Sequence, residues 1–482
     1  MASTIPIASP DEALKRLLPW LVGVAFFMQA LDMTILNTAV PAIAHAMDVR
    51  PLSVKSVLAS YMLSLAVFIP VSGWLADRFG TRRVFAGAIA LFTLGSVLCG
   101  LSDSLDMLIA WRVLQGAGGA MMIPVGRLTL VRTYDKSDLV RVLSFVALPA
   151  LVGPLIGPVL GGLIVSYLDW RYVFYVNVPV GLLGLAFVAR RLPDYREASV
   201  PPLDAVGLVL FGGGVALLSY VLEIFGEHEL SAVEILALFV VSLLLLALYG
   251  VRTTRVAHPI LDLSLFRVRT FRAAVVGGFV ARLGMGGAPF LFPLLYQIGF
   301  GLTPVQSGLL ILPQAIASIG LKRFVPAILE WLGFRAVLVG NTVLLGLMMA
   351  SFATVGVATP IWLIVLQALA LGFFMSLQYS AMNSLVFADV ATTRTSAAST
   401  IAAAGQQLSA SFGVAVAALT AAFFVPPQLH SHPAAIVDGV HHGFLALAAL
   451  TILSAATFME LRADDGQDVS RHPVDPHPVH EH

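Results

Sequence analysis

Residues 73–83 read Gly73-Trp-Leu-Ala-Asp77-Arg78-Phe-Gly80-Thr-Arg82-Arg83 and separate two long apolar stretches. A fainter copy, Glu330-Trp-Leu-Gly333-Phe-Arg335, places its acidic, glycine and arginine positions at a constant offset of 253 residues. Membrane proteins are commonly built from such repeated halves, with related motifs at equivalent points of each half. The pair therefore predicts two related helical blocks, one around each motif.

The sequence around both motifs is apolar enough to lie in a membrane. Hydrophobic residues make up 58% of the 482 residues and charged residues only 11%, whereas soluble proteins carry about 25% charged residues. The mean hydropathy is +0.91. This composition excludes a disordered chain, a nucleic-acid-binding protein and an ordinary cytosolic enzyme. The single cysteine, Cys99, excludes a disulfide framework and a thiolate metal site.

Charge-free stretches predict fourteen transmembrane helices, because each helix needs about 20 apolar residues to cross the hydrocarbon core. Two stretches, 283–321 and 336–388, have double length and break at residues 301–304 and 358–360. The apolar pattern shows none of the alternation of a β-barrel. The expected fold class is an all-α polytopic membrane protein with two six-helix bundles and two inserted helices.

This pattern divides the chain into seven segments. They are a cytoplasmic N-terminus (1–18), an N-terminal six-helix bundle (19–190), a cytoplasmic linker (191–203), two extra transmembrane helices (204–251), a second cytoplasmic linker (252–270), a C-terminal six-helix bundle (271–461) and a cytoplasmic tail rich in His and Pro (462–482).

The basic residues predict the orientation, because Lys and Arg are enriched in cytoplasmic loops. With the N-terminus inside, Arg50, Lys55 and Arg171 fall outside and Arg112 and Arg282 fall within spans. The rest of the 28 Lys and Arg residues then lie at cytoplasmic positions. Both termini are therefore expected in the cytoplasm.

Asp32 is the only acidic residue well inside a span, and an ionisable group there is a functional candidate. Burial raises the pKa of a carboxyl by up to roughly 3–5 units, which would allow Asp32 to exchange protons near neutral pH. The alternative is a structural Asp hydrogen-bonded beside Thr34 and Asn37. Arg282 either binds an anionic group of a substrate or extends to the cytoplasmic edge of the membrane.

Five motifs occur in the order typical of one family. They cover residues 31–41 (Leu-Asp-Met-Thr-Ile-Leu-Asn-Thr-Ala-Val-Pro), 73–83, 108–120 (with Arg112 and Gln115-Gly116), 153–162 (Gly-Pro-Leu-Ile-Gly-Pro-Val-Leu-Gly-Gly) and 170–181. On these motifs the chain resembles the major facilitator superfamily, in its fourteen-helix drug:proton antiporter branch. The resemblance implies a transporter fold of two six-helix bundles and, for Arg112, a part in proton coupling beside a carboxylate. The alternative for Arg112 is a buried arginine satisfied by carbonyl groups and Gln115.

The resemblance also implies two moving parts. A cytoplasmic latch that stabilises an outward-open state would consist of Gly73, Asp77, Arg78, Gly80, Arg82, Arg83, Glu330 and Arg335; the alternative is that these charges serve only membrane topology. A pliable helix-5 seal between the halves would consist of Gly153, Gly157, Pro158, Gly161 and Gly162. Three of these glycines share one helix face, so close helix packing is the alternative.

Other intramembrane polar residues are candidates for a substrate pocket, although such residues more often join helices to each other. The candidates are Gln29, Asn37, Gln115, Arg282, Gln378, Asn383, Gln406 and Gln407. The histidines near residues 430–442 and in the tail have no fixed ligand spacing, so no metal site and no cofactor is expected.

We expect a proton-coupled exporter of small amphipathic compounds that works by alternating access. It would lie in a bacterial inner membrane as a monomer, with a small-molecule substrate, protons and the lipid bilayer as its partners and no nucleic acid. An exporter of an organic anion or metal chelate is the alternative, because one buried acid faces two buried arginines. A non-transporting membrane sensor and a membrane enzyme are remoter alternatives, since no catalytic or nucleotide-binding motif is present.

Overall fold

The structure is a computed structural model that describes residues 12–134, 136–224, 231–391, 394–424, 433–462 and 464–467. All regular structure within these residues is helical. Thirteen of the described stretches are long and apolar enough to cross a membrane, and one of them, residues 304–354, holds two helices in 51 residues. Counting those two separately, as the sequence predicted, gives fourteen.

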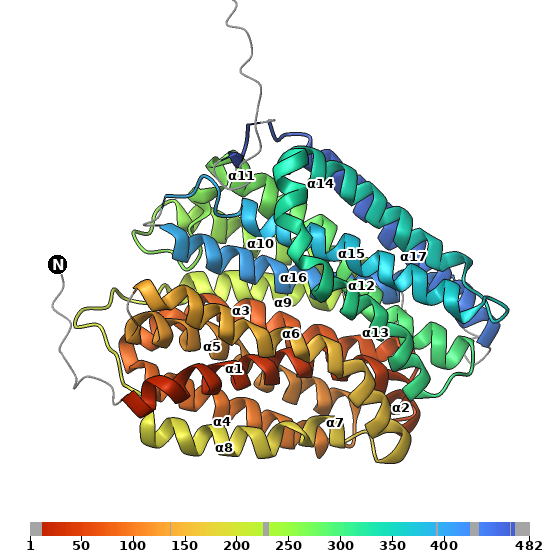
Figure 1. Ribbon diagram of the computed structural model, residues 1–482, viewed down its shortest axis with the longest axis horizontal. Helices are drawn as coiled ribbons and strands as arrows, with labels where there is room; N and C mark the ends of the chain where they lie inside the picture. Colours follow the sequence, from red (N-terminus) through yellow and green to blue (C-terminus); the bar gives the residue numbers. More distant parts are fainter. Residues whose placement is uncertain are drawn as a thin grey trace, which may run out of the picture.

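The first half of the chain forms the lower bundle in Figure 1. Its helices are α1 (Glu12–Ile35), α2 (Val40–Ala46), α3 (Lys55–Phe79), α4 (Thr81–Gly100), α5 (Leu105–Thr133), α6 (Lys136–Tyr167), α7 (Tyr172–Tyr175) and α8 (Asn177–Arg191). α1 packs along α6, while α5 packs against both α3 and α4. We refer to this bundle as the first half.

The second half forms the upper bundle in Figure 1. Its helices are α11 (Arg269–Arg272), α12 (Gly278–Pro293), α13 (Pro304–Gly320), α14 (Val325–Ser351), α15 (Ile361–Leu385), α16 (Thr395–Phe423) and α17 (Pro433–Phe458). π-helical turns at Ala273–Gly277 and Leu294–Gly299 extend α12 at both ends. α12 packs against α16 and α17, and α14 packs against α15 and α17.

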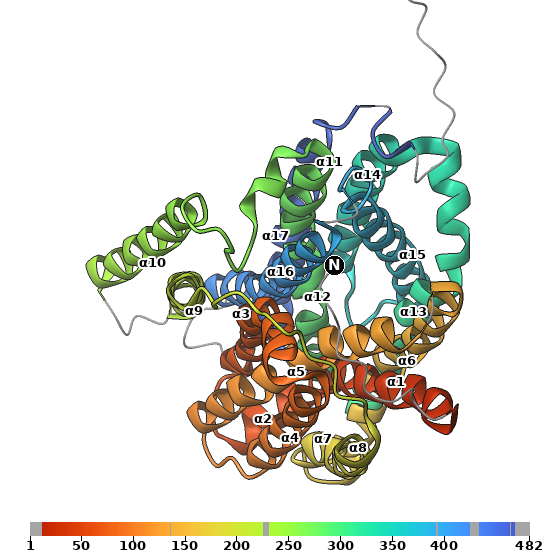
Figure 2. The ribbon, with the colours of Figure 1, turned by 90° about the vertical axis from the view of Figure 1, so that its left-hand side faces the viewer.

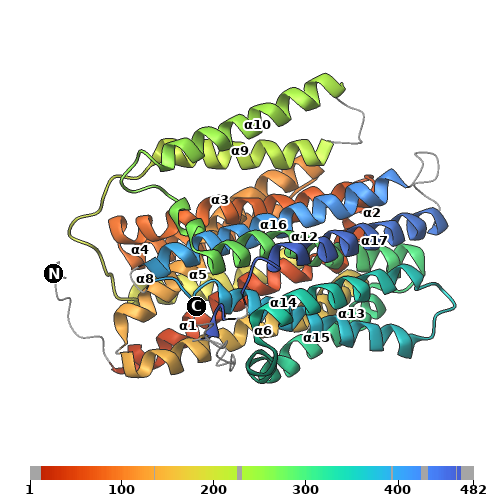
Figure 3. The same ribbon diagram turned by 90° about the horizontal axis from the view of Figure 1, so that it is seen from above.

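Two further helices, α9 (Ala205–Ile224) and α10 (Ala232–Thr253), form a hairpin beside the bundles. α9 contacts α3 of the first half and α16 of the second, so it lies along the line where the halves meet (Figure 2). α10 lies outside α9 along the same edge of the molecule (Figure 3). Asp204, just before α9, binds Arg252 at the end of α10 with an Oδ1–Nε distance of 2.7 Å.

The two halves touch chiefly through α3 with α16 and α6 with α13. The Ser411 hydroxyl of α16 donates to the carbonyl of Ala59 in α3 at 3.1 Å. On the other side, a Cβ on Gly308 of α13 would lie 2.4 Å from the carbonyl oxygen of Pro158 in α6. Glycine is thus what allows these two helices to approach so closely.

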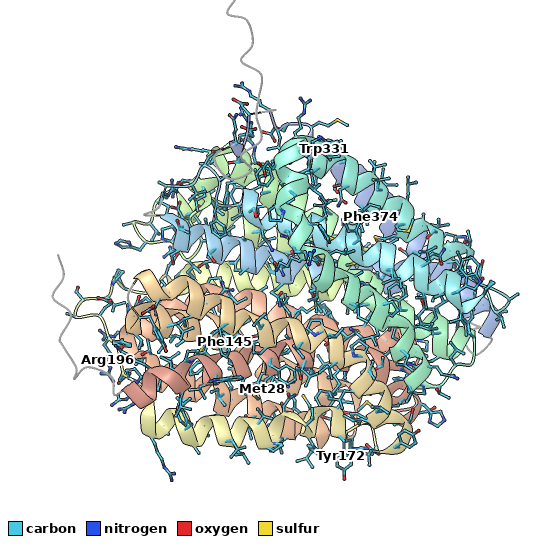
Figure 4. All side chains as sticks on the ribbon, in the orientation of Figure 1. Met28, Phe145, Tyr172, Arg196, Trp331 and Phe374 are labelled. Atoms are coloured by element: carbon cyan, nitrogen blue, oxygen red, sulfur yellow. The ribbon has the colours of Figure 1, made fainter. Side chains whose placement is uncertain are left out.

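The repeated motif forms a similar turn in both halves. Gly80 has φ 97° and ψ 144° between α3 and α4, and Gly333 has φ 72° and ψ 166° at a kink inside α14. Residues other than glycine rarely adopt this backbone conformation. Figure 4 labels Arg196 at the left-hand end of the lower bundle and Trp331, close to Gly333 in the sequence, at the top of the upper bundle. We call the ends of the two bundles that carry Gly80 and Gly333 the motif end of the molecule, and the opposite ends the far end.

The apolar pattern of the sequence predicts the last span at roughly residues 443–461, but the helix in the structure begins earlier, at Pro433. Polar residues in its first turns find partners there. The His441 ring nitrogen Nε2 lies 2.9 Å from the carbonyl oxygen of Val355, and the His442 ring stacks on Phe424. The remaining histidines of this loop and of the tail lie outside the described residues.

Candidate functional site

The buried acid of α1 is held by three other residues of the first half. The Asp32 side chain is 1% exposed, and its Oδ2 accepts from Arg112 Nη1 of α5 at 2.7 Å. Its Oδ1 accepts from Gln115 Nε2 at 2.8 Å and from Asn177 Nδ2 of α8 at 3.2 Å. Three helices therefore meet at one carboxylate, which we call the Asp32 network.

Arg112 has further partners on other sides. Its Nη1 also donates to Gln115 Oε1 at 2.8 Å, and its Nε donates to the Val57 carbonyl at 3.3 Å. The Tyr61 ring centre lies 4.1 Å from the guanidinium carbon, which is within the range of a cation–π interaction. Both sequence interpretations of Arg112 therefore describe part of its surroundings, because a carboxylate, a carbonyl and Gln115 all bind it.

Asp32 is hydrogen-bonded, as its structural alternative requires, but its partners are Arg112, Gln115 and Asn177 and not Thr34 or Asn37. The Thr34 hydroxyl donates instead to backbone carbonyls, including that of Gly153 at 3.3 Å. A helix turns by about 100° per residue, so Thr34 and Asn37 lie on a different face of the chain from Asp32. Asn177 was missed as a site residue, because nothing in the sequence shows that α8 reaches α1 at this point.

Within the part of the chain that the structure describes, the two larger cavities between the halves lie on either side of α1 and α15. The α13 cavity, of about 320 Å³, is lined by α1, α6, α12, α13 and α15. The α16 cavity, of about 460 Å³, is lined by α1, α3, α5, α6, α15 and α16. Asn383 of α15 lines both of them.

α1 forms a wall between these cavities and the Asp32 network. Thr34 and Asn37 face the α13 cavity, and Gln29 and Met33 face the α16 cavity. Asp32 faces away from both, into the first half. α1 is therefore the element that separates the Asp32 network from both cavities.

The structure sorts the predicted pocket residues into two groups. Those that line a cavity are Gln29, Asn37, Asn383, Gln406 and Gln407. Gln115 belongs to the Asp32 network, and the buried Gln378 bonds to Asn341 and to Thr342. Those two predictions are wrong for this conformation, because neighbouring helices already satisfy both amides.

Arg282 of α12 lies directly behind the cavity wall. Its side chain is 3% exposed, and its Nη2 donates to Asn383 Oδ1 at 2.9 Å. The guanidinium carbon lies 5.7 Å from the ring centre of Tyr379, which lines the α13 cavity. The expectation that Arg282 extends to the membrane edge is therefore wrong, because its charged group is held inside the second half.

The cavity walls carry positive charge. Lys322 lines the α13 cavity and Arg127 lines the α16 cavity. Among the lining residues that the structure describes, neither cavity has an Asp or Glu. The sequence offered no means of singling out Arg127 and Lys322, because basic residues near helix ends also serve membrane topology.

The glycine stripe of α6 packs mainly within its own half. Added Cβ atoms on Gly153, Gly157 and Gly161 would meet Ala30, Thr34 and the Ile35 carbonyl of α1. For these three glycines the expected seal between the halves is wrong in this conformation. The i, i+4, i+8 spacing defines one helix face, and that face is covered by the neighbouring α1.

Contact between the halves comes from the adjacent face of α6. A Cβ on Gly162 would lie 2.5 Å from the Pro304 carbonyl oxygen of α13, and Pro158 lies against Gly308. Gln297, in the turn after α12, donates through Nε2 to the Thr38 carbonyl of the first half at 3.0 Å. These contacts hold the far end together.

Two of the predicted latch residues, Asp77 and Arg82, lie at the motif end and bind partners within the first half in this conformation. Asp77 accepts from Arg132 Nη2 of α5 at 2.9 Å, and the same nitrogen donates to Glu197 at 2.6 Å. Asp194, after α8, accepts from the Arg82 backbone N–H at 3.1 Å. The sequence did not identify Arg132, Asp194 or Glu197, since Arg132 lies 55 residues from Asp77 and Asp194 lies 112 residues from Arg82.

The remaining latch candidates lie at the same end. Those with exposed side chains are Arg78, Arg83, Glu330 and Arg335, and Gly73 is exposed as well. Gly80 lies within the contact, because a Cβ there would approach Asp194 Oδ1 to 2.2 Å.

A helical bundle with repeated halves and cavities between them is the architecture of a membrane transporter. The sequence model of the Major Facilitator Superfamily matches residues 22–414. The chain therefore belongs to this superfamily of transporters, which move small molecules across membranes and are not enzymes.

Bacterial relatives match along almost the whole chain. A Serratia proteamaculans protein named "Putative multidrug resistance protein MdtD" is 39% identical over 445 residues, covering 92% of this chain and 93% of that protein. An Escherichia coli protein of the same name is 36% identical over 461 residues, covering 96% of this chain and 97% of that protein.

Solved structures share the fold at low sequence identity. The POT family transporter PepTSo has a TM-score of 0.68 and 15% identity, over 92% of this chain and 97% of that one. A D-xylose–proton symporter has a TM-score of 0.65 and 12% identity, over 93% of this chain and 98% of that one. These likenesses support the superfamily fold.

Proposed function

We propose that this protein is a proton-coupled exporter that binds small amphipathic compounds in the two cavities and releases them at the far end. The observation that carries the proposal is the Asp32 network, which lies directly behind the α1 wall of both cavities. An ionisable residue inside the membrane is a functional candidate, and the position of Asp32 beside Arg112, behind the wall of both cavities, suits it for the protonation that drives exchange.

The coupling follows from the charge balance of the network. When Asp32 takes up a proton, Arg112 becomes a buried cation without a charged partner, which is unfavourable in a medium of low dielectric constant. Movement of α1 with its neighbours α5 and α8 relieves this cost. The same movement changes the positions of Gln29, Met33, Thr34 and Asn37 in the cavity walls.

The orientation comes from the basic residues, which place the motif end in the cytoplasm. The far end, where α6 meets α13, is then the outer end, and the structure corresponds to a state closed to the outside. The Asp77–Arg132–Glu197 group is the latch in its released form, and in the opposite state Asp77 binds the second half. Both termini are cytoplasmic, the membrane is the bacterial inner membrane, and one chain is the transporting unit.

The relatives' names support export of drug-like compounds as the class of cargo. A proton gradient is a sufficient energy source, since one charge crossing 100 mV releases about 2.3 kcal/mol. The apolar residues of the cavities, such as Phe292 and Met375 in the α13 cavity, suit the apolar part of an amphipathic compound.

The test is uptake of candidate compounds into inverted proteoliposomes with an imposed pH gradient. Asp32→Asn should abolish uptake driven by the gradient while substrate binding persists. Asp103→Asn is the matched control, because Asp103 is 88% exposed and makes only a 3.4 Å contact with Arg171. Normal gradient-driven uptake by Asp32→Asn would refute coupling through this residue.

A further inference from the structure

Arg282 is a buried cation with an incomplete set of partners. Within the described parts of the chain, its guanidinium makes one side-chain hydrogen bond, to the neutral Asn383, and its buried Nε has no partner. Among the residues that the structure describes, no Asp or Glu lies within ion-pair distance of Arg282. Buried charges in proteins are normally paired, because an unpaired one loses its hydration without compensation.

The partners of Arg282 connect it to both cavities. Asn383 lines the α13 cavity and the α16 cavity, and Tyr379 lines the α13 cavity. A ligand at the junction of the cavities would therefore lie beside the Arg282–Asn383 pair. A small displacement of the Asn383 amide would open the guanidinium to that ligand.

The charges around this point all have the same sign. Lys322 and Arg127 add positive charge to the walls of the two cavities. The buried acid of the first half, Asp32, is already neutralised by Arg112 at 2.7 Å and faces away from the cavities. A cationic compound entering either cavity would therefore meet repulsion, and an anionic compound would meet attraction.

We propose that Arg282 and Asn383 bind the anionic group of an amphipathic substrate, such as a carboxylate, whose apolar body occupies the α13 cavity. This inference rests on the proposed export function and names its substrate class. The planar guanidinium matches the geometry of a carboxylate. Leu151, Phe292, Ile311 and Met375 supply the apolar surface, and Lys322 supplies a second cation.

The first experiment measures equilibrium binding to the purified full-length protein in nanodiscs, with no pH gradient. The probes are N-dansylglycine, which carries a carboxylate, and N-dansylglycinamide, which has a similar size and no charge. The wild-type protein should bind the carboxylate at least tenfold more tightly than the amide. Equal affinities, or no binding of either probe, would overturn the inference.

Variants test whether Arg282 causes the preference for the carboxylate probe over the amide probe. Arg282→Gln should lower affinity for N-dansylglycine roughly 10- to 100-fold, as expected when a hydrogen-bonded charge partner is lost, and should leave the amide unchanged. Arg282→Lys should keep part of the preference, because the charge remains and the planar guanidinium is lost. The matched control is Arg323→Gln, since Arg323 is exposed in the turn after α13 and lines neither cavity. A carboxylate preference that persists in Arg282→Gln would contradict the assignment.

Transport measurements distinguish a failure of the anion-site inference from a failure of the proposed export function. If both probes bind alike but an uncharged or cationic compound is exported under a pH gradient, the anion site is refuted and export stands. If N-dansylglycine binds through Arg282 but no compound moves under any gradient, the site stands as a binding site and proton-coupled export is refuted. Melting temperatures of each variant exclude misfolding as the cause of lost binding.

Discussion

Arg112 in the first half and Arg282 in the second are both almost completely buried, but their surroundings differ. Arg112 binds a carboxylate, an amide and a carbonyl, whereas Arg282 binds a single amide and leaves Nε unpaired. The first is a group whose hydrogen bonds are all made within the first half, and in the proposed mechanism a proton on Asp32 disrupts it. The second has hydrogen-bond donors without a partner, and these donors are available to a ligand. In the proposed exporter, the proton site therefore lies in the first half and the substrate anion site in the second.

The largest expected effect is a difference in the free energy of unfolding between variants of the two arginine sites, and it tests whether the sites differ. Asp32→Leu should lower the free energy of unfolding by about 3–5 kcal/mol, because it leaves Arg112 buried without its charged partner. Arg282→Leu should leave stability unchanged or raise it, because it removes a buried cation that has no such partner. Thermal unfolding in detergent measures both.

The control for this pair is Asp32→Leu combined with Arg112→Leu. Removing both charges should recover most of the stability that Asp32→Leu loses, because a buried ion pair replaced by apolar residues is often nearly neutral. Equal destabilisation by Asp32→Leu and Arg282→Leu would show that the two arginines are not different in kind.

A smaller effect is expected at the repeated turn. Gly80→Ala and Gly333→Ala should each cost about 1–3 kcal/mol, because both glycines have a positive φ that other residues rarely adopt. Gly80→Ala should cost more, since its Cβ would also approach Asp194 Oδ1 to 2.2 Å. Melting temperatures of the two variants test this order. Gly340→Ala is the control, because a Cβ there meets nothing within 4 Å.

The smallest effect concerns the segments that follow the last helix of each half. Asp465 binds Arg269 at 2.8 Å between Oδ2 and Nε, and its side chain is 6% exposed. Glu197 binds Arg132 with 31% of its side chain exposed. Asp465→Asn should therefore cost about 1 kcal/mol at neutral pH and Glu197→Gln less, because exposed ion pairs contribute little. Chemical denaturation compares them.

This difference should depend on pH in a defined direction. Burial opposes ionisation of Asp465, but the Arg269 guanidinium and the Arg462 N–H outweigh it and lower the pKa of this carboxyl below its ordinary value of 3.8. A lowered pKa in the folded state stabilises the protein above the ordinary value. The cost of Asp465→Asn should shrink as the pH falls through 3.8 and vanish below the lowered pKa; a constant cost would contradict the ion pair.

Local signals in the sequence were sufficient to predict where the helices break. The break before α13 combines Gly301, whose φ is 67°, with Thr303, whose hydroxyl caps the helix, and Pro304 at its first position. All three act within a few residues, so the chain alone predicts them. The start of α17 was misplaced, because His441 and His442 are polar and the sequence does not show that His441 meets the Val355 carbonyl or that His442 stacks on Phe424.

The residues of the candidate site also fall into those that the sequence indicates and those that it does not. Asp32, Arg112 and Arg282 stand out in the sequence because charges inside apolar spans are rare and costly. Their partners do not stand out, since Asn177 lies 145 residues from Asp32 and Asn383 lies 101 residues from Arg282. Gln115 and Gln378 resembled pocket residues, because an amide that joins helices and an amide that lines a cavity have the same composition signal.

The sequence by itself determined the membrane location, the number of helices, the repeated motif and the three buried charges, because each depends on composition or on neighbours along the chain. Only the tertiary structure decided which buried arginine pairs with a carboxylate and which keeps an unpaired donor. It also decided that α1 separates Asp32 from the cavities, and that the glycine stripe of α6 faces α1. Those features depend on which helices meet and at what depth, and side-chain partners separated by about a hundred residues are known only once the helices have packed.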